Sequence, residues 1–80
     1  MHDRKKSIIT IHADELSTHY FHAYPIHESQ KMNKFSDGES EITFNLIPSI
    51  ELARFILSQG SRVEIISPEW FKTETEKLKS

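Results

Sequence analysis

The 80-residue sequence contains no cysteine, and this absence excludes disulfides, thiolate metal sites and cysteine nucleophiles together. It has only two glycines, Gly38 and Gly60, so it lacks both a glycine-rich phosphate loop and the glycine-flanked elbow of a serine nucleophile. No apolar run approaches the roughly 20 residues of a transmembrane helix, and no apolar signal core follows the N-terminal charges. We therefore expect a cytoplasmic protein with no membrane contact, held together by packing alone.

Basic residues are not in excess either, because ten lysines and arginines face twelve aspartates and glutamates, for a formal charge of -2. Proteins that bind nucleic acid by themselves normally carry a basic excess that neutralises phosphates. We therefore expect no tight DNA binding by this chain alone, and Arg4, Lys5 and Lys6 are interpreted as a solvated chain end. We expect a flexible segment over residues 1–6 and one domain over residues 7–80.

The first half of the sequence predicts two strands with a helix between them. Alternating β-branched residues indicate a strand from Ser7 to Ala13, and Asp14 is placed as the N-cap of a helix from Glu15 to Ala23. The apolar residues of this helix recur at helical spacing, at Leu16, Tyr20 and either Phe21 or Tyr24. Gln30 to Phe35 predicts an edge strand whose lysines discourage pairing with another chain, followed by a hairpin at Ser-Asp-Gly.

The second half predicts a helix between two strands, and then a last helix. Glu41 to Ile47 alternates cleanly, which indicates a strand. Ser49 is placed as the N-cap of a helix of about ten residues that begins at Ile50 and closes at Gly60. Arg62 to Ile66 predicts the fourth strand. Pro68 begins the last helix, on which Trp70 and Phe71 are expected to fold back over the core, followed by Leu78.

This order of elements predicts an α+β, ferredoxin-like split βαβ fold, that is, βαββαβ with a C-terminal helix. Its four-stranded antiparallel sheet would carry the helices on one face. Within it we expect the strands through Ile9 and Phe44 to be central and parallel to each other, and those through Met32 and Ile65 to lie at the edges. The predicted core consists of Ile9, Ile11, Ile42, Phe44, Leu46, Leu52, Ile56, Val63 and Ile65.

Residues able to carry out chemistry are scattered. Five histidines invite a metal hypothesis, since His19 and His22 would share one helix face, but no carboxylate or cysteine follows at a ligand spacing. Asp37, Glu39 and Glu41 cluster around the hairpin, as solvated turn residues do. We therefore predict a non-catalytic domain without metal or cofactor.

The other face of the sheet is the predicted contact surface. Its outward positions are expected to be polar at the centre and aliphatic at the edges, with no aromatic residue on which RNA bases could stack. His12, Asn45 and Arg62 would fall on three neighbouring strands of this face and are the candidate contacts with a partner or ligand. Arg62 is the foremost of them, because a guanidinium holds a phosphate or carboxylate through two parallel hydrogen bonds. The alternative is a solvated rim charge.

The stretch from Pro48 to Leu78 resembles the C-terminal extension, called WCX, of bacterial WYL-domain transcriptional regulators. The match centres on the segment Glu-Leu-Ala-Arg-Phe-Ile-Leu-Ser-Gln-Gly from Glu51 to Gly60 and on Val-Glu-Ile-Ile-Ser-Pro-Glu from Val63 to Glu69. Upstream, the segment from Tyr24 to Lys31 and the Asp-Gly hairpin are similar to the family as well. Phe55 stands where the family often has tryptophan. The motif that names the WYL domain is absent, so its ligand-binding residues have no counterpart in this chain.

The resemblance implies a regulatory and assembly domain of a larger regulator. Such a protein would bind DNA through a winged helix-turn-helix and an effector through a WYL domain, both outside this sequence. The extension would pack in a homodimer, against the WYL domain of the same or the partner subunit, and couple the effector to DNA binding. The alternative is a free-standing ferredoxin-like sensor of a small molecule or a protein-interaction module. Whether the same reading frame encodes a helix-turn-helix distinguishes these two classes.

Overall fold

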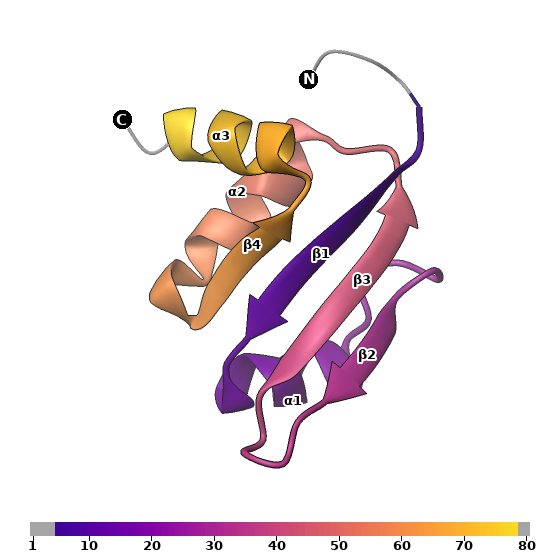
Figure 1. The fold of residues 1–80 in the computed structure, drawn as a ribbon, viewed down its shortest axis with the longest axis vertical. Helices are drawn as coiled ribbons and strands as arrows, with labels where there is room; N and C mark the ends of the chain where they lie inside the picture. Colours follow the sequence, from indigo (N-terminus) through magenta and orange to yellow (C-terminus); the bar gives the residue numbers. More distant parts are fainter. Residues whose placement is uncertain (1–4, 79–80) are drawn as a thin grey trace.

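Four strands form one antiparallel sheet in the order β2-β3-β1-β4 (Figure 1). The computed structural model describes residues 5–78. The strands are β1 (Ser7–Ala13), β2 (Lys31–Lys34), β3 (Ser40–Leu46) and β4 (Val63–Ser67), and the helices are α1 (Glu15–Ala23), α2 (Ile50–Ser58) and α3 (Glu69–Lys77). The predicted α+β split βαβ fold is confirmed, and the strands through Met32 and Ile65 lie at the edges of the sheet as expected.

The two central strands, β1 and β3, run antiparallel, with Ile9 opposite Phe44 and Ile11 opposite Ile42. The prediction that they run parallel is therefore wrong. The reason lies in the connections. The crossover through α1 returns the chain in β2 parallel to β1, and the tight hairpin then reverses it, so that β3 must oppose both β2 and β1.

The hairpin between β2 and β3 is closed by its own backbone. The Phe35 amide donates to the Glu39 carbonyl over 2.8 Å, and Gly38 has a φ of 91°, in the left-handed region that glycine adopts without strain. The carboxylate of Asp37 accepts a hydrogen bond from the Glu39 amide. Glycine and aspartate at these positions therefore make the reversal that the sequence pattern predicted, although β2 is shorter than the predicted range from Gln30 to Phe35.

Helix α1 begins where it was predicted to begin, because the Asp14 carboxylate accepts a hydrogen bond from the Ser17 amide over 2.8 Å. The buried face is nevertheless turned from the expected one. Thr18 and Phe21 are buried, whereas Leu16 and Tyr20 are exposed. The Thr18 hydroxyl lies 2.7 Å from the hydroxyl of Ser40 at the start of β3, and this buried contact holds the Thr18 side of the helix against the sheet.

The chain between α2 and β4 makes one further short helix. Ser49 caps α2 by accepting a hydrogen bond from the Leu52 amide, as predicted, and Gly60 has a φ of 65° where α2 has ended. A 3-10 turn, η1 (Gly60–Arg62), then includes Arg62, so β4 begins at Val63 and not at Arg62.

The core lies between the sheet and the helices. All nine predicted core residues are buried, and Ala13, Phe21, Ala53 and Phe71 join them. Trp70 is partly buried and packs against this cluster, so the interpretation that Trp70 and Phe71 fold back over the core is confirmed. On the sheet, buried and exposed residues alternate along β1, β3 and β4, as expected for a sheet covered on one face.

Phe44 is fully buried at the centre of β3, so its truncation should be costly. We expect Phe44→Ala to lower the free energy of unfolding by about 3 to 5 kcal/mol, because a large cavity forms in a thin core. Urea denaturation followed by circular dichroism measures this change. The control is Thr43→Ala on the opposite face of the same strand. A loss of less than about 1 kcal/mol for Phe44→Ala would show that Phe44 does not face the core.

Two buried threonines should respond oppositely to the same substitution. Thr18 shares its hydroxyl hydrogen bond with Ser40, whereas the Thr75 hydroxyl is buried with no hydrogen-bond partner within residues 5–78. Thr18→Val should cost about 1 to 3 kcal/mol because it orphans Ser40, and Thr75→Val should be neutral or stabilising. Thermal and urea unfolding of both variants tests this. Equal destabilisation by the two substitutions would contradict the assignment.

Candidate outward sheet face

The sheet face opposite the helices, here called the outward face, is formed by the exposed and half-exposed positions of the alternating strands. Each strand contributes every second residue, because successive side chains point to opposite faces. The outward positions are Ile8, Thr10 and His12 on β1, Lys31 and Asn33 on β2, Glu41, Thr43 and Asn45 on β3, and Glu64 on β4. Beyond Ile65 the register of β4 shifts, so that Ser67 and not Ile66 lies opposite Thr10, and Ile66 is exposed at this irregularity. This face is the candidate contact surface that the sequence predicted.

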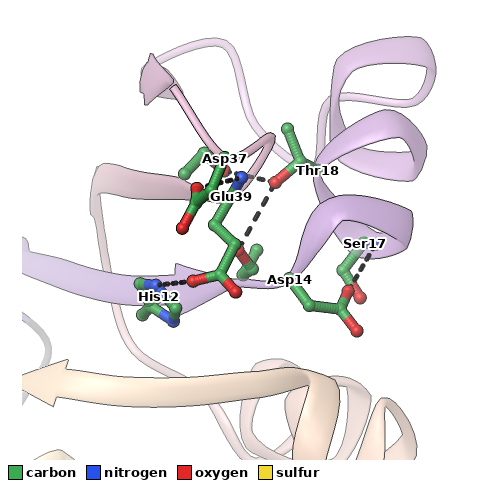
Figure 2. Close-up of polar contacts among 8 residues, drawn as sticks. His12, Asp14, Ser17, Thr18, Asp37 and Glu39 are labelled. Carbon is green, nitrogen blue, oxygen red and sulfur yellow. Dashed lines mark hydrogen bonds and ion pairs between the residues drawn. The ribbon is translucent and has the colours of Figure 1, made fainter. Parts of the chain in front are cut away.

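His12, on the outward face, contacts two other side chains, those of Glu39 and Phe35. Its Nε2 lies 2.9 Å from Oε1 of Glu39 (Figure 2). Its ring also stacks on that of Phe35, at a centroid distance of 6.3 Å. In the strand register, Glu41 and Glu64 lie directly beside it on either side. Three carboxylates therefore surround a single imidazole, which makes this end of the outward face acidic.

Asn45 lies at the opposite end of the outward face from His12. Asn45 is paired with Ile8, which comes four residues before His12 along β1. At the usual rise of a strand, Ile8 and His12 are roughly 13 Å apart. The backbone amide of Asn45 donates a hydrogen bond to the hydroxyl of Ser29 over 2.8 Å, and that hydroxyl lies 2.8 Å from Nδ1 of His27. These contacts anchor the segment that leads into β2 beside the end of β3.

Arg62 lies in η1, just before β4, so it does not occupy a strand position of the outward face. Its carbonyl accepts a hydrogen bond from the Asp14 amide, which fixes this turn against the end of β1. The side chain is exposed. His12, Asn45 and Arg62 therefore do not converge on one site, although each remains accessible to a partner.

The group that the structure does assemble is His12, Glu39 and Phe35, and the sequence interpretation missed it. The expectation that the outward face has no aromatic residue is wrong at this corner, because Phe35 stacks on His12 while remaining 41% exposed. Extending the strand alternation through the hairpin would have placed Phe35 and Glu39 on the side of His12. Glu39 was instead interpreted as a solvated turn residue, and Phe35 as the last residue of the predicted edge strand.

The remaining histidines do not come together. His19 and His22 are exposed on α1 and His27 bonds to Ser29, whereas His2 lies outside the described residues. Within residues 5–78, no group of three or more histidine and acidic side chains has the arrangement of a metal site.

The outward face also carries exposed aliphatic side chains at the end away from His12. Ile8 is 62% exposed and Ile66 is 46% exposed, on the neighbouring strands β1 and β4. Ile47, which follows β3 at the same end of the sheet, is 50% exposed. The outward face is therefore acidic and aromatic at one end and aliphatic at the other.

Comparison with known proteins adds no further identification. No family model matches the sequence, and no curated protein resembles it closely enough to count as a relative. In the part of the chain that the structure describes, no helix is both long and apolar enough to cross a membrane.

Proposed function

We propose that this chain is a non-catalytic regulatory and assembly domain, of the kind found at the C-terminus of WYL-type helix-turn-helix transcriptional regulators. In this role it contributes to dimerisation and transmits the effector state to DNA-binding domains elsewhere in the regulator. DNA is reached only through those domains, since the chain has a formal charge of -2.

The observation that carries this proposal is the aliphatic end of the outward face. Single exposed apolar residues are normal on a protein surface, but a group of them on adjacent strands favours contact with another protein. Ile8, Ile47 and Ile66 form such a group where β1 begins and where β3 and β4 end. A domain that docks through a sheet face needs this kind of surface, and the helices leave it uncovered (Figure 1).

The resemblance to the WCX extension supports the same role. Its matching residues build α2, the turn η1 and β4, where Gly60 adopts a positive φ and Val63 and Ile65 enter the core. These residues therefore have structural roles in this chain that are compatible with the sequence pattern of the WCX family.

The first test is the reading frame, which should encode helix-turn-helix and WYL domains upstream of this chain. In the purified regulator, Ile8→Glu should weaken dimerisation in sedimentation velocity and change the effector dependence of DNA binding. The matched control is Leu16→Glu on α1, because Leu16 and Ile8 are each 62% exposed and only Ile8 lies on the outward face. A reading frame without those domains would overturn the regulator assignment. Identical behaviour of the two variants would overturn docking through the outward face.

Arg62→Ala tests the predicted anion contact separately. The side chain is exposed and forms no hydrogen bond or ion pair within residues 5–78, so the free energy of unfolding should change by less than about 0.5 kcal/mol. In the regulator, the substitution should alter the effector response of DNA binding. If dimerisation and effector response both survive it, Arg62 has no part in the contact.

A further inference from the structure

The two edges of the sheet differ in how they are protected. The β2 edge carries Lys31 and Lys34, and lysines at an edge discourage the addition of another strand. The β4 edge reads Val-Glu-Ile-Ile-Ser and has neither lysine nor proline. The irregularity in its pairing with β1 lies beyond Ile65, so the pairing of the stretch from Val63 to Ile65 is regular. Figure 1 shows β4 at the border of the sheet, with α3 beyond its end. The β4 edge is therefore the one that a further strand can approach.

The backbone of β4 has hydrogen-bonding groups to offer at this edge. The Asp14 amide donates to the Arg62 carbonyl, and bonded and non-bonded pairs alternate along an antiparallel ladder. Val63 and Ile65 are consequently the non-bonded partners of β1, and their N–H and C=O groups point away from it. No other backbone partner for these groups lies within residues 5–78.

A groove of about 370 Å³ lies beside this edge, between α2 and α3. Ile56 and Leu57 of α2 and Val63 and Ile65 of β4 give it an apolar lining, while Lys72 and Glu76 of α3 stand along its far wall. An added strand would direct every second side chain toward this groove and the others toward the outward face. The groove therefore selects an apolar residue at alternate positions.

The charge of the neighbouring side chains determines which residue an added strand would favour between those two apolar positions. It would lie beside Glu64 on the outward face, where Glu41 and Glu39 also lie around His12. Directly opposed unlike charges stabilise a pair of strands, and like charges destabilise it. A basic residue is favoured there. A second copy of β4 is disfavoured, because it would bring its own Glu64 to the same edge.

We propose that the free edge of β4 binds an extended peptide segment of a partner protein with the alternation apolar, basic, apolar, which joins the sheet as a fifth strand. Its backbone pairs with Val63 and Ile65, its apolar side chains enter the groove between α2 and α3, and its basic side chain lies beside Glu64. This inference is separate from the regulatory role proposed above, because it rests on the edge of β4 and on Glu64, whereas that role rests on Ile8, Ile47 and Ile66 at the other end of the outward face.

The probe is the fluorescently labelled peptide acetyl-Thr-Ile-Lys-Ile-Thr-amide, titrated with the whole chain and followed by fluorescence anisotropy. We expect saturable binding with a Kd below about 1 mM. Glu64→Lys should weaken it by about three- to tenfold and strengthen binding of the matching peptide Thr-Ile-Glu-Ile-Thr to a similar degree. Glu41→Lys, the same charge change two strands from the edge, is the matched control and should have a smaller effect.

Backbone pairing is tested by methylating the peptide amides one at a time. Methylation should abolish binding only at alternate amides, and the amide resonances of Val63 and Ile65 should shift on binding. Absence of binding at 1 mM peptide, indifference to methylation, or shifts confined to the outward face would each overturn the proposal. So would self-association of the chain through β4 that the peptide does not displace. These outcomes leave the regulatory proposal untouched, since that rests on Ile8 and its neighbours.

Discussion

Strand β1 is the element on which the rest of the domain depends. It is hydrogen-bonded on both sides, to β3 and to β4, and it buries Ile9, Ile11 and Ala13 completely on one face. In a chain of this size the core is thin, and each buried branched side chain contributes roughly 1.5 to 3 kcal/mol. All three α-helices contribute buried residues to the core on this face of the sheet, which leaves the outward face open.

A sheet covered on one face still exposes its other face and its edges, and in this chain these two surfaces differ in composition. The outward face has an acidic, aromatic end around His12 and an aliphatic end around Ile8. The edge of β4 has unpaired backbone groups next to an apolar groove. The first surface suits docking of another folded domain, and the second suits an extended segment. The two contacts rest on different residues, because the first uses Ile8, Ile47 and Ile66 and the second uses Val63, Glu64 and Ile65.

Local signals in the sequence predicted the elements well. Asp14 and Ser49 cap α1 and α2 as expected, and the bounds of β1 and α1 were predicted correctly from alternation, capping and helical spacing. The buried side of α1 could not be predicted locally, because it is set by the Thr18 contact with Ser40, 22 positions away. The direction of β3 follows from the crossover through α1 together with the predicted hairpin, and the sequence interpretation did not combine the two. Finding the group of His12, Glu39 and Phe35 required the pairing of β1 with β3 as well as the alternation of β2 and β3 continued into the hairpin.

The central claim is that this domain covers one face of its sheet and leaves the β4 edge open. Amide hydrogen exchange along β4 tests this claim most directly. The Glu64 amide faces β1 at a bonded position and should exchange slowly, together with the amides of β1 and β3 at bonded positions. The Val63 and Ile65 amides should exchange much faster, which gives an alternating pattern along one strand. Equal protection of all three amides would contradict an open edge.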